Sequence, residues 1–223
     1  MSLKQHLFLG WTLVLITLGL VGFWVPSAEQ VIGESYLIFF FHFPSAINCL
    51  NFFVFAGILG ILHLVKRTAR TDFWSASAVE VGVLACTITL VTGSTWARAA
   101  WGIWWDMSDK RLMTVAAMWL TYCGYLALRA MHEEPVKRGR FCAVFAVIAM
   151  VNVPLVYFSI RWFGVEHHPM EVTMNEASMI WTRWFGVLAF LVLYTGLWRL
   201  RFRVLENAHR ERCLEEDFAR AGI

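Results

Sequence analysis

Four tryptophans fall within ten positions of this chain, at Trp96, Trp101, Trp104 and Trp105. Because residues three and four apart share a face of a helix, a helical conformation here would bring Trp101, Trp104 and Trp105 together. An aromatic surface of this kind, with charge at its edge, suits a planar apolar ligand or a protein partner. The charged residues that follow it directly are Asp106, Asp109, Lys110 and Arg111.

Histidines provide a second kind of chemistry. His42 lies in an apolar aromatic run, and His167 and His168 are adjacent in a more polar segment. Neutral imidazole is a common axial ligand of haem iron, so His42 with His167 or, alternatively, His168 predicts a haem site. The alternative for His42 is a histidine that hydrogen-bonds a neighbouring helix; for His167 and His168 it is a solvated pair in a loop.

Basic residues near the tryptophans fit the same ligand. Haem is an apolar disc with two propionates, and a guanidinium group binds a carboxylate through two parallel hydrogen bonds. The alternative for Lys110 and Arg111 is that they simply begin the next helix. The candidates for propionate binding are Arg98, Lys110, Arg111 and Arg183.

The elements that position these residues are expected to be membrane-spanning helices. The chain is 59% hydrophobic and 16% charged, with a mean hydropathy of +0.58, and its apolar residues come in long runs. A spanning helix needs roughly 20 apolar residues. Six segments qualify, and we expect an all-α polytopic protein with a single domain over 1–223, of which 201–223 is a charged cytoplasmic tail. The segments are 7–25, 35–65, 73–93, 112–131, 141–161 and 178–200. No convincing cleavage site follows the first one, so it is expected to remain as a span.

Lysine and arginine predict the orientation. With the N-terminus inside, fourteen of the nineteen basic residues fall on the inner side and five on the outer side. This bias favours an N-in, C-in topology. It puts three features on the outer face: the start of the second span with His42, the tryptophan-rich loop between the third and fourth spans, and the loop with His167.

Other chemistry has little support. The net charge of +3 does not indicate a nucleic-acid partner, and we expect none. The five cysteines show no metal-like spacing and no C-x-x-C-H motif, so covalent attachment of haem is not expected. No phosphate-binding glycine loop or H-E-x-x-H motif is present. Membrane interfaces explain most of the remaining tryptophans.

Three motifs, in order, resemble those of the haem-handling proteins of cytochrome c maturation. The region around Trp104 is similar to their tryptophan-rich "WWD" signature, and the region around His42 to their first histidine motif. The chain length and six spans resemble the haem exporter protein C (CcmC) family rather than the larger CcsA-type synthetases. The motifs are Phe41-His42-Phe43-Pro44-Ser45-Ala46, then Thr92-Gly93-Ser94-Thr95-Trp96 with Trp101-Gly102-Ile103-Trp104-Trp105 and Asp109-Lys110-Arg111-Leu112, and finally Val151-Asn152-Val153-Pro154 with Tyr157, Ser159, Trp162 and His167.

The signature here departs from the family pattern W-G-x-W-W-x-W-D-x-R. Met107 stands where a third tryptophan of the motif is expected. The motif acid is therefore Asp106 or Asp109, and Asp109 is favoured because Arg111 then keeps its spacing.

The resemblance implies a non-enzymatic protein of the bacterial inner membrane that holds haem b, non-covalently and transiently, on its periplasmic face. His42 and His167 would be the axial ligands, and Trp96, Trp101, Trp104 and Trp105 the platform. Arg98, Asp109, Arg111 and Arg183 would lie around the propionates and rim. The implied partners are a periplasmic haem chaperone (CcmE), a small subunit (CcmD) and an ABC transporter module (CcmA and CcmB), with membrane lipid around the spans.

Two other functions fit parts of the sequence. One is a cytochrome b-like membrane redox subunit, which usually holds haem between histidines buried within its bundle, often in two pairs. The other is a membrane transporter with an aromatic outer gate. A transporter needs a polar path through the spans, and only Glu80 and Asn152 are visible for one.

Overall fold

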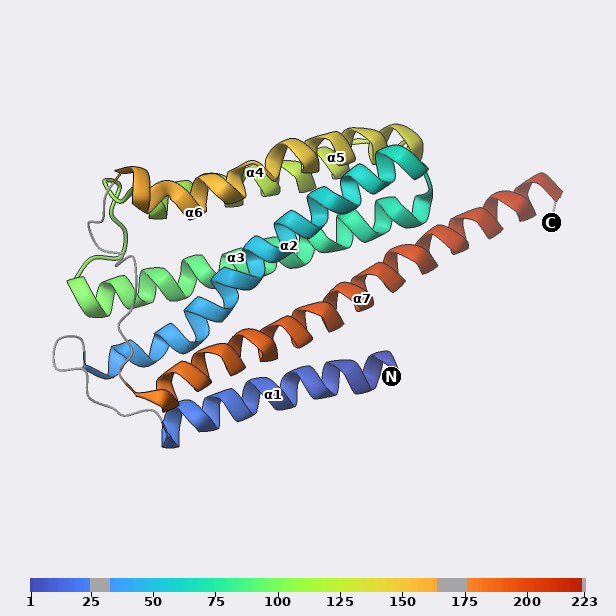
Figure 1. The fold of residues 1–223 in the computed structure, drawn as a ribbon. Coiled ribbons are helices and arrows are strands. Elements are labelled where there is room, and N and C mark those ends of the chain that lie inside the picture. Colours follow the sequence, from blue (N-terminus) through green and yellow to red (C-terminus); the bar gives the residue numbers. More distant parts are fainter. Residues whose placement is uncertain (25–32, 164–175, 222–223) are drawn as a thin grey trace.

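The structure is a computed structural model, and it describes residues 1–24, 33–163 and 176–221. Within these ranges every regular element is a helix, which confirms the expected all-α class (Figure 1). In chain order the helices are α1 (Leu3–Phe23), the 3-10 helix η1 (Gly33–Ile38), α2 (Phe39–Lys66), α3 (Ala69–Trp101), α4 (Lys110–Met131), α5 (Pro135–Ala149), α6 (Asn152–Phe163) and α7 (Ala177–Ala221).

Local chemistry explains where several helices begin and end. The side chains of Ser2 and Thr68 cap α1 and α3, each by accepting a hydrogen bond from a backbone N–H of the first turn. α3 ends at Trp101 and is capped by Gly102, whose φ of 76° lies in the left-handed region that glycine adopts without a Cβ penalty. Asp109 then caps α4 through the amides of Arg111 and Leu112. The segment 102–109 is therefore a short connection between two well-defined ends.

A proline accounts for the break between α5 and α6. Pro154 has no N–H to donate to the carbonyl of Met150, and its ring clashes with a helical carbonyl at that position. The chain turns at Met150 and Val151 and resumes as α6 at Asn152. The two pieces still follow one apolar stretch, Pro135–Ser159, which is long enough to cross a membrane.

α2 and α3 form the centre of the molecule. Figure 1 shows them between a pair made by α1 and α7 and a group made by α4, α5 and α6, in agreement with the contacts between elements. Small residues of α3 such as Ala78 and Ala85 are fully buried and allow α2 to approach closely. Across this core the ring of Phe53 stacks on Tyr122, with centroids 3.7 Å apart.

The expected multi-pass character is confirmed, but the count of six spans is not. Five stretches are long and apolar enough to cross a membrane: Leu3–Phe23, Tyr36–Lys66, Ala69–Trp101, Pro135–Ser159 and Ala177–Ala221. The remaining expected span corresponds to α4, which has 22 residues but is not among these five. Threonine and tyrosine side chains within α4 lower its hydropathy, so its passage through the membrane stays a prediction.

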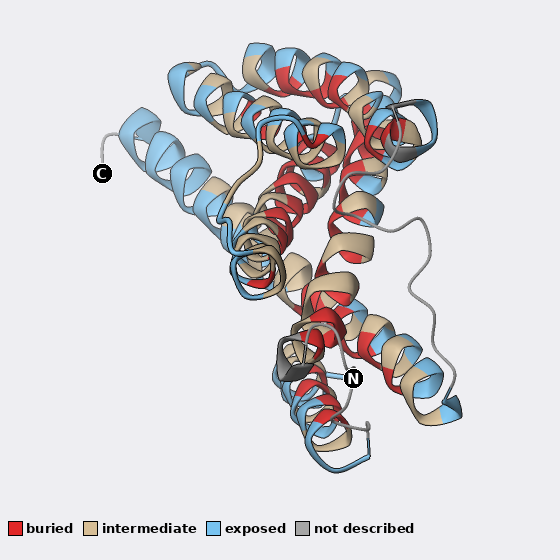
Figure 2. Ribbon diagram, turned by 90° about the vertical axis from the view of Figure 1, so that its left-hand side faces the viewer, coloured by how far each residue is buried: buried red, intermediate tan, exposed pale blue. Residues whose placement is uncertain are grey.

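The charged tail continues the last helix. α7 runs without interruption from Ala177 to Ala221, and its last turns are exposed (Figure 2). Arg201, where this tail begins, donates two hydrogen bonds to the carboxylate of Glu80, one of them 3.1 Å long. Glu80 is one of the two polar residues that could form a transport path through the spans, and this ion pair neutralises its charge.

Candidate functional site

The start of α2, the end of α3 and the start of α4 lie at the same end of the molecule (Figure 1). Between them is an open groove, which we call the tryptophan groove; the empty space in and around it, open solvent included, is about 780 Å³. Its walls are mostly apolar, and its polar groups come from α2, α3, the connection to α4 and the start of α4. The lining residues are His42, Ala46, Cys49, Leu50, Thr89, Leu90, Gly93, Ser94, Ala97, Trp101, Ile103, Trp104, Asp106, Asp109, Arg111, Leu112, Val115, Met118 and Val156.

His42 lies on the α2 wall of this groove, one turn after the start of the helix. Its Nδ1 is 3.1 Å from Oγ1 of Thr92 on α3. The Thr92 hydroxyl donates its own hydrogen to the carbonyl of Ile88, 2.7 Å away, so it is an acceptor toward the imidazole. Nδ1 of His42 therefore carries the proton, and the lone pair of the neutral ring lies on Nε2, the nitrogen suited to bind iron.

The four tryptophans do not form a single helical face. Trp96 and Trp101 belong to α3, which ends at Trp101, whereas Trp104 and Trp105 follow in the connection to α4. Trp101, Trp104 and Trp105 would share a face only in a continuous helix, and that condition is not fulfilled, because Gly102 turns the chain out of the helix.

Trp96 has a supporting position behind the histidine. It is buried, with only 7% of its surface exposed, and its ring packs against Phe39, His42 and Trp101 at centroid distances of 6.1, 6.0 and 6.1 Å. Phe39 and Trp96 belong to a small apolar cluster distinct from the main core. Trp96 therefore fixes the α2–α3 contact that holds His42 and does not line the groove.

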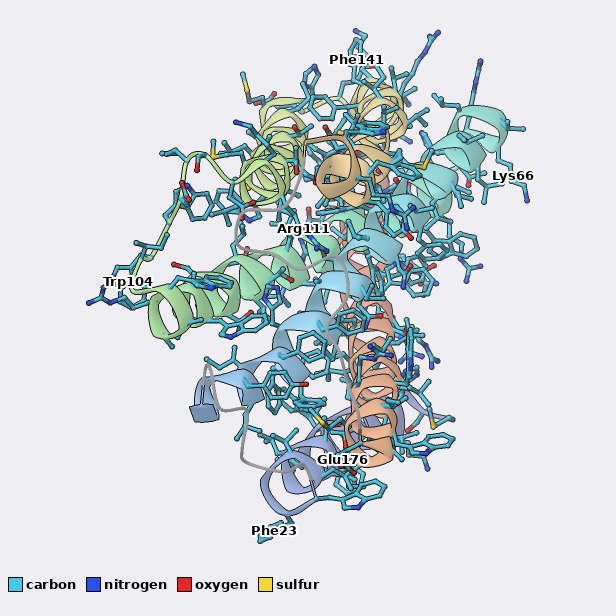
Figure 3. All side chains as sticks on the ribbon, turned by 60° about the vertical axis from the view of Figure 1, so that its left-hand side comes forward. Phe23, Lys66, Trp104, Arg111, Phe141 and Glu176 are labelled. Carbon is cyan, nitrogen blue, oxygen red and sulfur yellow. The ribbon has the colours of Figure 1, made fainter. Side chains whose placement is uncertain are left out.

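Trp101 and Trp104 are the two tryptophans in the groove lining. Trp104 is 58% exposed and lies at the outer edge of this end of the molecule, as Figure 3 shows. Its carbonyl accepts a hydrogen bond of 2.8 Å from the hydroxyl of Ser94, which ties the connection back onto α3. Trp105 is half-buried and is not part of the lining.

Arg98 closes the end of α3. Its guanidinium donates a hydrogen bond to the carbonyl of Gly102 and lies 6.0 Å from the centroid of the Trp104 ring. A cation at the C-terminal end of a helix also interacts favourably with the helix dipole. In this conformation Arg98 supports the Trp104 edge of the groove and is not itself among the lining residues.

The acids and Arg111 line the α4 side. The carboxylate of Asp109 is buried and accepts hydrogen bonds from the amides of Arg111 and Leu112 at 2.9 and 3.0 Å. Asp106 accepts two hydrogen bonds from Ser108, at 2.8 Å from its amide and 2.7 Å from its hydroxyl. Both candidates for the motif acid thus border the groove, and Asp109 has the additional task of starting α4. Arg111 lies closer to the centre of the bundle than Trp104 (Figure 3).

Arg183 is not among the groove-lining residues that the structure describes. Arg183, on α7, lies over the rings of Phe43 and Trp184, with its guanidinium carbon 5.7 and 5.1 Å from their centroids. His167 and His168 lie in 164–175, outside the residues that the structure describes. In the described residues, no group of three or more histidine, cysteine or acidic side chains could hold a bare metal ion.

Comparison with known proteins assigns the family. A family model described as "Heme exporter protein C" matches residues 2–220. The chain belongs to the haem exporter protein C family. This confirms the resemblance seen in the three sequence motifs, and it supports a role in haem handling for cytochrome c maturation.

Individual relatives of the haem exporter protein C family cover most of the chain. Heme exporter protein C of Escherichia coli strain K12 is 28% identical over 198 residues, which is 87% of this chain and 80% of that protein. Heme exporter protein C of Bradyrhizobium diazoefficiens is 31% identical over 172 residues, 76% of this chain and 64% of that protein. A putative cytochrome c biosynthesis ccmC-like mitochondrial protein of Marchantia polymorpha is 28% identical over 156 residues, 70% and 65% of the two chains.

In this member of the haem exporter protein C family, sequence reasoning assigned no role to Thr92, Gly93 or Ser94, although all three lie in the recognised motif. Thr92 orients His42, Gly93 lies against the same imidazole, and Ser94 anchors the tryptophan connection. One feature of the sequence could have indicated the role of Thr92. It lies four residues before Trp96, so both side chains project from one side of α3 toward α2.

Proposed function

We propose that this protein binds haem in the tryptophan groove, on the outer face of the membrane, and delivers it to a periplasmic haem chaperone (CcmE). The observation that carries the proposal is the His42–Thr92 hydrogen bond, which puts the proton of the imidazole on Nδ1 at the wall of a mostly apolar groove. A porphyrin brings four nitrogen ligands of its own, so a haem site needs only axial imidazoles. This fits a groove with one histidine better than it fits a site for a bare metal ion.

The orientation of the groove follows from charge. We propose six spans, with α4 as the fourth and with α5 and α6 together as the fifth, and both termini in the cytoplasm. Arginine and lysine are concentrated at the end of the bundle opposite the groove and on the tail of α7, as the positive-inside rule requires. The groove then opens to the periplasm of a bacterial inner membrane.

Different residues of the groove bind the iron, the porphyrin face and the propionates of the haem. His42 supplies one axial ligand through Nε2, and His167, or alternatively His168, supplies the other. Trp101 and Trp104 contact the porphyrin face, and Trp96 supports His42 from behind. Arg111, which lines the groove, pairs with a propionate, and Arg98 holds the Trp104 edge where a second propionate can reach it.

An open groove suits a carrier that must release its cargo. Trp104, which lines this open groove, is more than half exposed, so a partner could reach a haem bound beside it. We propose that CcmE docks over the Trp104 edge of the groove. The small subunit CcmD and the transporter module of CcmA and CcmB complete the system, and since this chain carries no nucleotide-binding motif, the energy comes from them. The chain then acts in delivery and not in catalysis.

The test is the haem content of the purified protein. The absorbance of co-purifying haem per mole of protein is measured for the wild type and for His42→Ala, His167→Ala and His168→Ala. His42→Ala is expected to lose most of the haem, and one of the other two variants is expected to lose a comparable amount. His132→Ala is the matched control, because His132 lies at the far end of α4, where it hydrogen-bonds the local carbonyl of Leu128 and packs on Phe141.

Two outcomes contradict the proposal. Unchanged haem content in His42→Ala would remove the axial ligand assignment. Rapid reduction of the bound haem by a quinol, with no transfer of haem to purified CcmE, would instead identify a redox subunit.

A further inference from the structure

A second cavity lies at the other end of the molecule. It is formed by the end of α2, the starts of α3 and α5, and α7 beyond the bundle, and its volume is about 1160 Å³ counted to its mouth. We call it the basic pocket. Its lining residues are His63, Leu64, Arg67, Ala69, Asp72, Phe73, Pro135, Val136, Arg138, Arg140, Val144 and His209.

Positive charge dominates this pocket. Arg67, Arg138 and Arg140 line it, and Asp72 is the one acid among the lining residues that the structure describes. The Asp72 carboxylate is already neutralised by Arg129, which donates two hydrogen bonds of 2.8 Å to its two oxygens. Three guanidinium groups therefore remain without a lining acid to balance them.

Arg138 is half-buried and carries a donor that an anion in the pocket could satisfy. Its Nε is buried and has no hydrogen-bond partner among the described residues. An unpaired buried donor is costly, and a charged one more so. An anion in the pocket would satisfy it. The adjacent N-cap residue of α5, Glu134, does not cap the backbone amides of the helix with its side chain; its carboxylate instead pairs with Lys137 at 2.7 Å.

Arg67 supports the same conclusion from the backbone. It has a φ of 52°, the only positive φ of a non-glycine residue in the part of the chain that the structure describes. A left-handed conformation is unfavourable for a side chain of this size, and such conformations gather at functional sites. Here it ends α2 and leaves an arginine at the pocket wall.

The pocket is also partly apolar. Leu64, Phe73, Val136 and Val144 lie among the arginines, and Val136 and Val144 are 78% and 42% exposed. If Pro135–Ser159 spans the membrane, exposed valines on it would face acyl chains. The ligand that matches arginines beside such valines has an anionic head and an apolar tail.

We propose that the basic pocket binds the phosphate group of an anionic phospholipid of the cytoplasmic leaflet. Arg138, Arg140 and Arg67 contact the phosphate, and the acyl chains lie along Val136 and Val144. Basic pockets between spanning helices on the cytoplasmic side bind headgroups of this class. The choice of leaflet rests on the proposed orientation of the chain; the binding of the lipid itself does not.

The experiment measures lipid binding to the full-length protein in detergent. After delipidation, a fluorescent phosphatidylglycerol is titrated into the wild type and into Arg138→Gln. Arg203→Gln is the matched control, because Arg203 lies on α7 outside the pocket lining. The wild type and Arg203→Gln are expected to bind equally, and Arg138→Gln at least several-fold more weakly. Unlabelled phosphatidylglycerol should displace the probe, and phosphatidylcholine should not.

Arg140→Glu keeps the test decisive if Arg138→Gln does not fold, because Arg140 is exposed and its replacement leaves the core intact. Equal binding by Arg140→Glu and the wild type would overturn the proposal. So would displacement of the probe by inorganic phosphate or by haem at concentrations similar to those of the lipid, which would identify a soluble anion or the cargo as the ligand.

Haem absorbance is recorded on the same samples. Loss of lipid binding with unchanged haem is the expected result for the pocket variants. A His42→Ala protein that keeps its lipid affinity would show that the two sites are independent. Haem absorbance tests the haem assignment and probe binding tests the lipid assignment, so the failure of one can be distinguished from the failure of the other.

Discussion

The backbone of Gly93 lies directly against the imidazole of His42. A Cβ added at Gly93 would be 2.9 Å from Cε1 of that ring and 3.4 Å from Nδ1. Thr92, the preceding residue, accepts the hydrogen bond from the same Nδ1. Two adjacent residues of α3 therefore determine where the candidate ligand sits and which of its nitrogens carries the proton.

Replacing Gly93 with alanine should displace His42. The new methyl group would be too close to the ring, so the imidazole must move away from Thr92 and from its place in the groove. We expect Gly93→Ala to retain several-fold less haem after purification. Gly19→Ala is the control, because nothing lies within 4 Å of a Cβ at Gly19. Equal haem content in both variants would mean that the ring position is not critical.

Thr92→Val should weaken the haem site without removing the ligand. Valine has nearly the same shape as threonine but cannot accept the hydrogen bond from Nδ1. Residues that orient a metal ligand in this way typically contribute about 10–100-fold in metal affinity. We expect a loss toward the lower end of this range, with a shifted haem reduction potential, whereas Thr92→Ser should retain both properties. A Thr92→Val protein with the wild-type potential would argue against the hydrogen bond as an orienting contact.

The two tryptophans beyond α3 should differ in effect. Trp104 lines the groove and Trp105 does not. Trp104→Ala is therefore expected to reduce haem retention clearly, and Trp105→Ala only slightly. Absorbance of the purified proteins measures the difference. The reverse order would indicate that the ligand approaches the connection from its other side.

Asp109 should contribute to stability as a helix cap. Asp109→Ala removes the acceptor for the amides of Arg111 and Leu112, and the loss of such a cap costs about 1 kcal/mol. Asp109→Asn retains a capping oxygen and should be nearly as stable as the wild type. Thermal unfolding in detergent compares the two. If Asp109→Asn is stable but loses haem, the charge of Asp109 serves the groove as well as the cap.

Among the ion pairs of the described residues, Asp72–Arg129 should contribute most to stability. Only 7% and 11% of these side chains are exposed, so Asp72→Asn leaves a largely buried guanidinium without its counter-charge. Breaking a buried pair in this way costs about 3–5 kcal/mol. Glu216→Gln, which breaks the exposed pair with Arg220, should change stability by less than about 1 kcal/mol. Similar melting temperatures for the two variants would contradict this ranking.

Composition and hydrophobic runs alone determined that the chain is an all-helical, multi-pass membrane protein, because long apolar stretches have few other stable solutions in a bilayer. Motif order alone also identified the family. Local patterns predicted the segments well, except that one apolar run became α5 and α6, where Pro154 breaks the helix, and that α4 is too polar to count clearly as a span.

Only the tertiary structure decided how the site residues are arranged. Spacing could suggest that Trp101, Trp104 and Trp105 share a face, but the left-handed turn at Gly102 separates them. Sequence spacing could not distinguish Trp96, which packs behind His42, from Trp104, which lines the groove. Nor could it show that Arg183 lies over the ring of Trp184. The Nδ1 atom of His42 hydrogen-bonds Thr92, fifty positions away in the sequence. Such pairings depend on how α2 crosses α3, and that geometry arises from packing between helices, which no local pattern contains.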